Sequence, residues 1–201
     1  MRRRKYELKA RADSQEQTRQ RIISAAMELH EEVGPGQTSI SAVATRAGVQ
    51  RVTVYRHFPD ELTLLRACGG QYRSLHPPPD PERWRLIKDP SERLVSALHD
   101  LYVHFRDTAA MWGHVLRDAD TSKIVREAAE PRFSYLRSVA AVLAADWPKR
   151  ASRAIIGHAT QFRTWQSLDE EGLTDDLAAR LMTRLAELAA SASDSRPHRP
   201  G

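Results

Sequence analysis

Apolar residues recur at helical spacing in almost every segment of this chain, and this periodicity limits the possible folds more than any other feature. The clearest stripes, with members three or four residues apart, are formed by Ile22, Ala26, Leu29 and Val33, by Leu94, Leu98, Leu101 and Phe105, and by Leu177, Leu181, Leu185 and Leu188. No alternation of apolar and polar residues longer than a few positions is bounded by turn residues. The sequence therefore predicts an all-α fold with about nine helices.

Proline and glycine residues divide the chain into parts. The stretch from His76 to Pro81 contains four prolines, which make it stiff and non-helical and mark the best domain boundary. Ser14 and Gln17 have the spacing of a capping box, which predicts that the first helix begins there. The chain is thus divided into a basic N-terminal arm, a first helical domain, a larger second helical domain and a disordered tail, at residues 1–15, 16–76, 82–191 and 192–201.

The excess positive charge is concentrated at one end. The net charge of the chain is +5, and residues 1–11 alone contain six basic residues against one acidic residue. We expect this arm to be poorly ordered without a partner. The segment from Val33 to Pro59 contains no acidic residue, although it keeps three arginines. Because carboxylates repel a phosphate backbone, a surface without them favours a polyanionic partner.

Several classes of protein are excluded or disfavoured. Cys68 is the single cysteine, so the chain has no internal disulfide and no cysteine-rich zinc site. A lone helical cysteine is usually a small hydrophobic residue, although a redox sensor is an alternative. The segment His30–Gly34 begins like a zinc-protease motif but lacks its second histidine, and no phosphate-binding glycine motif or nucleophile elbow is present. We expect no catalytic site, no metal and no cofactor.

No segment suits a membrane. The longest strongly apolar run, Val139–Ala145, is far too short to cross a bilayer. The basic residues at the start resemble the beginning of a signal peptide, but no apolar core follows them. We therefore expect a cytoplasmic protein.

The segment Thr38–Leu65 carries the strongest functional signal. Its first part predicts a short helix that ends in a tight turn at Gly48, and a second helix begins near Gln50 and turns Val54 and Phe58 inward. Two short helices joined by such a turn form a helix-turn-helix. A plain helical hairpin would share this pattern. The outward residues of the second helix, none of them acidic, are Gln50, Arg51, Thr53, Tyr55, Arg56 and His57.

The neighbouring residues distinguish these alternatives. Three stretches between about Glu16 and Tyr72 read RIISAAMELHEEVG, TSISAVATRAGV and VTVYRHFPDELTLL, and the sequence Tyr-x-His-Phe begins six residues after Val49. In these stretches the chain closely resembles the TetR family of bacterial transcriptional regulators. The resemblance implies an all-helical homodimer, with three N-terminal helices for DNA binding and a larger C-terminal domain for ligand binding and dimerisation. It also implies a repressor that a small molecule releases from a pseudo-palindromic operator in double-stranded DNA.

The resemblance also implies which residues contact DNA. The implied phosphate contacts at the first helix of the motif are Thr38, Ser39 and Ser41, the implied base contacts are Gln50, Arg51, Val52 and Thr53, and the implied backbone contacts after them are Tyr55 and His57. Family members usually have a lysine at the start of the following helix, where this chain has Asp60 or Glu61. Asp60 suits a helix N-cap. The missing phosphate contact is instead expected from Arg2–Arg4.

After Tyr72 the resemblance is generic, although FRTWQSLDEEGLTDDLAARLMTRLAEL is similar to the last two helices of one actinobacterial-type subgroup. In the family these helices pair with their copies in a four-helix dimer interface. We expect them at about 149–168 and 173–190. The small residues Gly157, Thr160 and Thr164 share one side of the first and would face the partner.

Aromatic residues mixed with histidines predict a ligand cavity in the second domain. The candidate lining residues are Tyr102, Phe105, Trp112, Tyr135, His158, Phe162 and Trp165. Aromatic residues at helical spacing more often form a core. Polar groups from the histidines favour a cavity for a mostly apolar, unidentified small-molecule effector with one or two hydrogen-bonding groups. The alternatives are a regulator that needs no ligand, and an all-α enzyme or adaptor that reuses the fold.

Overall fold

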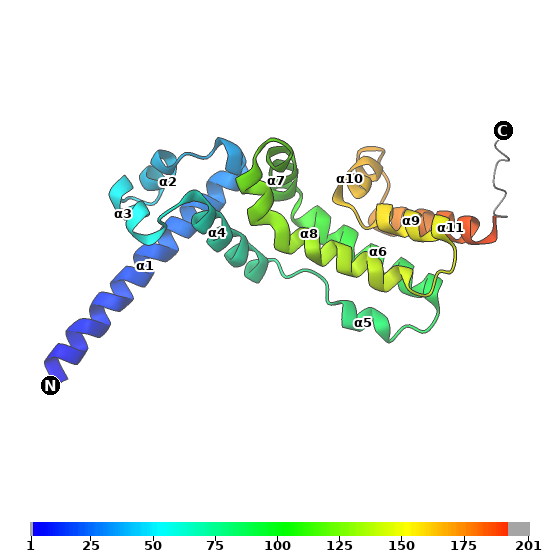
Figure 1. Ribbon diagram of the computed structural model, residues 1–201, viewed down its shortest axis with the longest axis horizontal. Helices are drawn as coiled ribbons and strands as arrows, with labels where there is room; N and C mark the ends of the chain where they lie inside the picture. The colour runs from blue at the N-terminus through cyan, green and yellow to red at the C-terminus, as the bar shows by residue number, and fades with distance from the viewer. Residues whose placement is uncertain (1, 193–201) are drawn as a thin grey trace, which may run out of the picture. The chain divides into compact units, whose positions relative to one another are not determined.

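The computed structural model describes residues 2–192, and these residues form eleven α-helices, one short 3₁₀ turn and no strand (Figure 1). The prediction of an all-α fold is confirmed. The predicted number of about nine helices is close, and the difference arises from the short helix α5 (Pro81–Arg85) and from a break near the C-terminal end. Most of the expected disordered tail, residues 193–201, lies outside the described residues.

The described residues group into two compact units. The first consists of residues 2–77 and 108–131, and the second of residues 78–107 and 132–192. The sequence-based division differs, because it places all of residues 82–191 in one domain. Residues 108–131 join the first unit because the helix α7 (Ala109–Thr121) packs against the end of the first helix and the turn that follows it.

The first unit contains the helix-turn-helix and the elements that support it. Its elements are α1 (Arg2–Glu32), η1 (Pro35–Gln37), α2 (Ile40–Arg46), α3 (Arg51–His57), α4 (Glu61–Leu75), α7 and the residues of α8 (Lys123–Ala144) as far as residue 131. Figure 1 shows the amino-terminal part of α1 extending away from the helices α2, α3 and α4, which gather around its other end.

The predicted start of the first helix at Ser14 is wrong. The helix α1 begins at Arg2, and the backbone carbonyl of Ser14 lies inside the helix, where it accepts a hydrogen bond from Thr18 Oγ1 at 2.9 Å. Residues 2–13 are mostly arginine, lysine, glutamate, leucine and alanine, without glycine or proline. These are strong helix formers, so propensity extends the helix through the capping pattern. The expected poorly ordered arm is therefore helical over its described residues.

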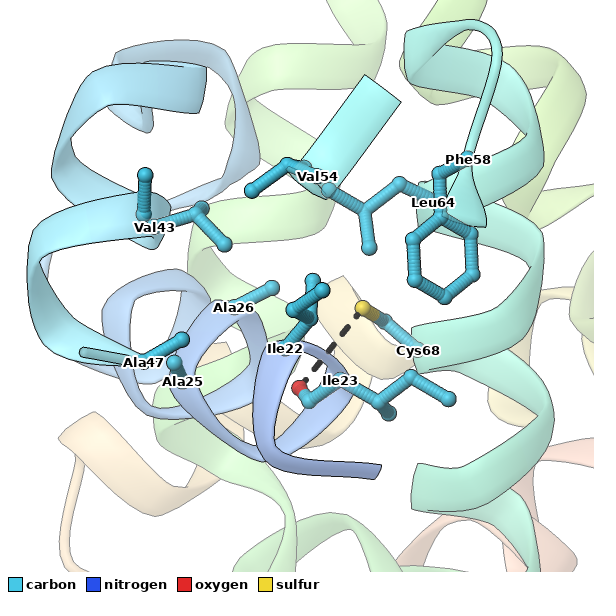
Figure 2. Packing of buried hydrophobic residues seen from close by; sticks show 11 residues of the cluster. Ile22, Ile23, Ala25, Ala26, Val43, Ala47, Val54, Phe58, Leu64 and Cys68 are labelled. Carbon is cyan, nitrogen blue, oxygen red and sulfur yellow. Dashed lines mark hydrogen bonds between the residues drawn. The ribbon is translucent and has the colours of Figure 1, made fainter. Parts of the chain in front are cut away.

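The core of the first unit lies between α1, α2, α3 and α4 (Figure 2). Ile22 and Ala26 on α1 are fully buried beside Val54 of α3 and the ring of Phe58. Cys68 on α4 is part of this core, with its Sγ atom 3.9 Å from the carbonyl oxygen of Ile23. The inward positions predicted for the motif are thus the positions that fix α2 and α3 on α1.

The second unit contains α5, α6 (Pro90–Asp107), the later part of α8, α9 (Arg150–Ala159), α10 (Phe162–Glu170) and α11 (Asp175–Ser191). The helix α11 packs against both α6 and α9. Its buried side is made of the small or flexible residues Ala178, Ala179, Met182, Thr183 and Ala186.

The single helix expected at about 149–168 is wrong, because the chain breaks between α9 and α10. Gln161 has extended backbone angles and precedes α10 as its N-cap. Side chains bond carbonyl groups at the break: Thr164 Oγ1 donates to the His158 oxygen at 2.7 Å, and Gln161 Nε2 donates to the Gly157 oxygen at 3.0 Å. Polar side chains thus compete for the backbone at this break, which contains no proline.

No helix in residues 2–192 combines the length and the apolar character that crossing a membrane would require.

Candidate nucleic-acid interface

The helices α2 and α3 are joined by a tight turn with the geometry that the sequence predicted. Gly48 has a φ of 65°, in the region that favours glycine, and a Cβ atom there would have nothing within 4 Å. The backbone conformation, and not lack of space, is therefore what requires glycine. After the turn, the N–H of Val49 donates to the Ala44 oxygen at 3.0 Å, which closes the end of α2.

The exposed side of α3 presents donors and apolar groups without a carboxylate. Arg51, Val52, Tyr55 and Arg56 are exposed, and the side chain of Val52 is 68% exposed, whereas Val54 is fully buried. The structure brings the exposed Gln50, which is the N-cap of α3, next to Arg51 and Val52. Thr53 is half-buried, so it is less available than the other three implied base contacts.

The implied phosphate contacts at the start of α2 differ in their availability. Ser39 is exposed and its Oγ accepts a hydrogen bond from the Ala42 N–H at 3.1 Å, so its hydroxyl hydrogen can still be donated to a phosphate. Ser41 is also exposed. The Thr38 hydroxyl is half-buried and already donates to the Gly34 oxygen at 2.8 Å. It would have to turn away from that oxygen to bond a phosphate.

His57 is the last residue of α3 and is half-buried. Its Nε2 atom is buried and has no hydrogen-bond partner among the described residues. Burial, together with the nearby charges of Arg56 and Arg19, lowers the pKa of the imidazole below its usual value. A phosphate contact from His57 would therefore use a neutral N–H group unless the phosphate itself raises the pKa.

Arg19 on α1 was missed by the sequence analysis. Its guanidinium carbon lies 5.1 Å from the centre of the Phe58 ring, directly after α3, and its charge acts on His57. A signal was present in the sequence, since Arg19 precedes the buried Ile22 and Ile23 by three and four residues on one helix face. The structure thus adds a cation from α1 to the end of α3.

The unusual acidic residue after the motif has a structural role. Asp60 caps α4, with its carboxylate accepting the Thr63 N–H at 2.7 Å, as expected for an N-cap. Hydrogen bonds from Thr63 lower the pKa of Asp60, so the carboxylate is charged at neutral pH. Glu61 is exposed in the first turn of α4.

Cys68 is not placed to sense oxidants. It is buried in the core of the first unit, and burial raises the pKa of its thiol to about 12. Oxidation and nucleophilic attack require an accessible thiolate. The structure therefore supports the interpretation of Cys68 as a small hydrophobic residue. The described residues include no cluster of three or more histidine, cysteine, aspartate or glutamate side chains suited to a metal ion.

Four of the seven candidate ligand residues form one buried cluster in the second unit. The ring centres of Phe105 and Phe162 are 5.6 Å apart, and those of Phe162 and Trp165 are 5.2 Å apart. The ring centres of Tyr102 and Phe105 are 6.3 Å apart, and the Tyr102 hydroxyl donates to the Ala159 oxygen at 2.9 Å. These four aromatic side chains are packed against one another as a core is.

The structure does not bring the other three candidates into this cluster. Trp112 is buried in the first unit, His158 is exposed on α9, and the Tyr135 hydroxyl donates to the Pro79 oxygen at 2.6 Å. A residue that the sequence analysis missed does reach the cluster. The guanidinium of Arg132 lies 5.6 Å from the Phe105 ring centre, and its Nη1 atom is 2.7 Å from His104 Nε2.

The expected small-residue dimer face is corrected by the structure. Thr160 and Thr164 are buried within their own chain and cannot face a partner. The exposed apolar residues of this region lie on α11 instead. The leucines of its outer side, each between 40% and 55% exposed, are Leu177, Leu181, Leu185 and Leu188. We call these four residues the α11 leucine stripe.

Fold and interface together define a helix-turn-helix protein. Residues 22–68 match the family described as bacterial regulatory proteins, tetR family. This part of the chain is therefore a helix-turn-helix domain of the TetR family, as its sequence indicated.

The matching relatives are regulators. The chain is 44% identical over 52 residues to the HTH-type transcriptional regulator SrpR of Pseudomonas putida, covering 26% of this chain and 24% of that protein. It is 42% identical over 59 residues to the uncharacterized HTH-type transcriptional regulator TtgW of a Pseudomonas putida strain, covering 29% of this chain and 43% of that protein. The chain thus matches less than half the length of these curated relatives, and neither is named as an enzyme.

Solved structures share the fold over most of the chain. A TetR-like transcriptional regulator from Rhodococcus sp. RHA1 has a TM-score of 0.61 at 19% identity and covers 88% of this chain and 97% of its own. NalD, the secondary repressor of the MexAB-OprM multidrug efflux pump in Pseudomonas aeruginosa, has a TM-score of 0.59 at 23% identity, with the same coverage. At these identities the likeness extends to the fold alone.

Proposed function

We propose that this chain is a sequence-specific DNA-binding transcriptional regulator. In the fuller form of the proposal, it represses transcription as a homodimer until a small molecule releases it from a pseudo-palindromic operator. The observation that carries the proposal is the exposed side of α3, which offers arginine, valine and tyrosine side chains and no carboxylate. A recognition helix in the major groove needs such a surface. Base edges present hydrogen-bond acceptors and thymine methyl groups there, and the nearby phosphates would repel a carboxylate.

The contacts follow from the chemistry of each side chain. Arg51 can donate two hydrogen bonds to the O6 and N7 atoms of a guanine, and Gln50 can pair with an adenine. Val52 has no polar group, and the apolar group that the major groove offers is the thymine methyl. Ser39 and Tyr55 are exposed hydroxyls that suit phosphate oxygens. Base contacts on α3 would then specify the sequence, while the phosphate contacts would fix the orientation.

The α11 leucine stripe supports a homodimer. The opposite side of α11 is buried against α6 and α9, so the stripe faces away from the chain's own core. A row of four half-exposed leucines on one helix is an apolar patch of the kind that marks an interface. A second copy of the same helix offers a matching surface, and a twofold dimer of this kind presents two recognition helices to two half-sites.

The aromatic cluster of the second unit supports a mostly apolar effector. Phe105, Phe162 and Trp165 supply large apolar surfaces, and the Arg132–His104 pair supplies polar groups beside them. A ligand that entered this cluster would have to displace packed side chains, so ligand entry would change the packing of α6 against α10. This coupling is the proposed route by which a ligand would alter DNA affinity.

A mobility-shift assay tests the proposal. The probe is the DNA that flanks the protein's own gene, and the control is a scrambled fragment of equal length and composition. We expect a retarded band with the first probe at a protein concentration that leaves the control unshifted. Equal binding to both fragments, or binding to neither, would contradict sequence-specific regulation. Loss of the shift on addition of an aromatic compound would support the ligand-released repressor.

A further inference from the structure

The turn between α1 and α2 is held by side chains from α7, far away in the sequence. The Gly36 N–H donates to Asp118 Oδ2 at 2.8 Å. Arg117 bridges the same region, since its Nη2 donates to the Val33 oxygen at 2.8 Å and its Nε donates to Asp118 Oδ1 at 2.8 Å. Asp118 is only 7% exposed. A buried carboxylate and its arginine thus satisfy the backbone of this turn.

The backbone of the turn is shaped around these two side chains. Gly34 has a φ of 97°, which L side chains rarely adopt. A Cβ atom on Gly34 would lie 2.4 Å from Arg117 Nη2 and 2.6 Å from Asp118 Oδ2. A Cβ atom on Gly36 would lie 3.0 Å from Asp118 Cγ. Glycine is needed at Gly34 for both reasons, so α7 and the turn fit each other closely.

The turn leads directly into the DNA-facing end of α2. The Gly34 oxygen accepts the Thr38 hydroxyl at 2.8 Å, and the Pro35 oxygen accepts the Thr38 N–H at 3.2 Å. Ser39 follows as the N-cap of α2. Because Gly36 precedes Ser39 by three residues, any shift of the Gly36 backbone also shifts the start of α2.

Asp118 holds the turn as an anion without repelling DNA. Burial opposes its ionisation, but hydrogen bonds from Arg117 and Gly36 outweigh burial and keep the pKa of the carboxyl below its usual value. Hydrogen bonds to a charged carboxylate are stronger than neutral ones. The adjacent Arg117 compensates the charge, so the turn gains a strong acceptor that adds no exposed carboxylate.

We propose that Asp118 is a positioning residue for DNA binding, which acts through Gly36 to place Ser39 and Ser41 against phosphate. This inference rests on the proposed DNA-binding function. Asp118 would itself touch no DNA. Its loss would weaken the phosphate contacts of α2 and leave base reading by Arg51 unchanged.

The test is the substitution Asp118→Asn, with Asp107→Asn as the matched control. Both remove one negative charge, which by itself strengthens binding to a polyanion. Asp107 is exposed at the end of α6. We expect Asp118→Asn to weaken operator binding by roughly tenfold, because a charge-assisted bond to the turn is lost, with its thermal melt still cooperative. The control variant should bind as the wild type does or more tightly.

A double-mutant cycle separates positioning from general loss of structure. The double variant Asp118→Asn with Ser39→Ala should lose little more operator affinity than either single variant, because both changes act on the same phosphate contact. Combined with Arg51→Ala, the two losses should add. If Asp118→Asn does not fold, Arg117→Gln, which keeps the bond from Gly36 to the carboxylate, should give a smaller loss with the same pattern.

The outcomes distinguish the two proposals. Wild-type protein that binds no operator would overturn the proposed function and the positioning role with it. Wild-type protein that binds its operator, with a folded Asp118→Asn variant that binds equally well, would overturn the positioning role alone. Equal coupling of Asp118→Asn to Ser39→Ala and to Arg51→Ala would also overturn it, since a loosened fold weakens every contact.

Discussion

Arg106 at the end of α6 and Asp175 at the start of α11 form a two-point ion pair. Arg106 Nε lies 2.9 Å from Asp175 Oδ2, and Arg106 Nη2 lies 2.9 Å from Asp175 Oδ1. Asp175 Oδ1 also accepts the indole N–H of Trp165 at 3.0 Å. One carboxylate therefore joins α6, α10 and α11, the helix that carries the leucine stripe.

The substitution Asp175→Asn is expected to destabilise the second unit. Burial opposes the charge of Asp175, but bonds from Arg106 and Trp165 keep its pKa below the usual value. The guanidinium of Arg106 is partly solvated, so the expected loss is modest, roughly 1–2 kcal/mol of unfolding free energy. The carboxylate's contribution is present at neutral pH and is lost only as pH falls below the usual pKa of aspartate. Urea unfolding at pH 7 measures the loss.

The matched control for this prediction is Asp176→Asn. Asp176 is the next residue of α11, pairs with Arg180 on the same helix and is exposed. Exposed helical ion pairs contribute little, so stability should hardly change. Equal destabilisation by both substitutions would show that charge at the start of α11 matters, and not the bonds to Arg106 and Trp165.

A glutamate in the α11 leucine stripe is expected to separate the dimer. Leu181→Glu and Leu185→Glu would each place a charge in a desolvated interface, where an unpaired charge is strongly unfavourable. Sedimentation velocity at tens of micromolar should show dimer for the wild type and monomer for these variants, with unchanged helical content. Thr160→Arg is not a test of the interface, because Thr160 is fully buried in its own chain and the change would disrupt the fold.

The control for the dimer prediction is Leu86→Glu. Leu86 is an exposed leucine outside the stripe, 83% exposed after α5, so its replacement should leave the oligomeric state unchanged. If both stripe variants remain dimeric, the interface lies elsewhere on the chain.

The stability of the first unit is expected to fall in mildly acidic solution because of His30. His30 is buried, and burial lowers its pKa to about 4, although the charge of Asp118 acts in the opposite direction. The folded state therefore binds the proton less readily than the unfolded state, in which the pKa has its usual value of about 6.5. The contribution of His30 to the unfolding free energy is fully present above pH 6.5. It decreases as pH falls towards 4, by roughly 3 kcal/mol in total.

His30→Gln should flatten this dependence. Its urea midpoint should change less between pH 7 and about pH 4.5 than that of the wild type. The exposed His158, replaced in the same way, should leave the wild-type profile unchanged. A His30→Gln profile as steep as that of the wild type would assign the acid sensitivity to other groups.

The parts of the structure that local pattern determines were predictable from the sequence. Three positions follow from the residues directly beside them. Gly48 has the positive φ that a turn after a helix requires, and Val54 and Phe58 lie one turn apart and point inward. The N-cap role of Asp60 follows in the same way.

The parts that depend on distant contacts were not predictable in this way. Nothing in the periodicity of α7 indicates that Asp118 bonds to Gly36, 82 positions earlier. The break between α9 and α10 consists of Thr160 and Gln161, so neither glycine nor proline marks it in the sequence. It depends on which carbonyl groups the nearby threonine side chains reach. At Ser14 a correct local signal was overridden by the helix propensity of the residues before it.

Arg51→Ala is expected to relax sequence preference at one position of each operator half-site. Arg51 is exposed on α3, and losing its two bonds to a guanine should cost about 1–3 kcal/mol at that position. Binding to a panel of operators that differ by one base pair measures the effect. Arg56→Ala, which removes an equal charge later in the same helix, should weaken binding to all sequences alike. An unchanged preference profile for Arg51→Ala would contradict its assignment to a base.

Deletion of residues 1–11 is expected to reduce the salt dependence of DNA binding. These residues carry a net charge equal to that of the whole chain, and α1 begins at Arg2, so the deletion removes helix as well as charge. If the basic residues follow phosphates, the slope of log K against log salt should fall by about 0.9 for each phosphate that is no longer neutralised. The preferred operator should hardly change, because phosphate contacts carry no sequence information.

A charge variant separates the loss of helix from the loss of charge. Lys9→Gln combined with Arg11→Gln keeps the length of α1 and good helix formers at both positions while it removes two cations. If charge is the cause, this variant should show part of the reduced slope and no loss of specificity. If the truncated protein and the charge variant both show the same slope of log K against log salt as the full-length wild type, this end of α1 is a solvated extension that makes no contact with DNA.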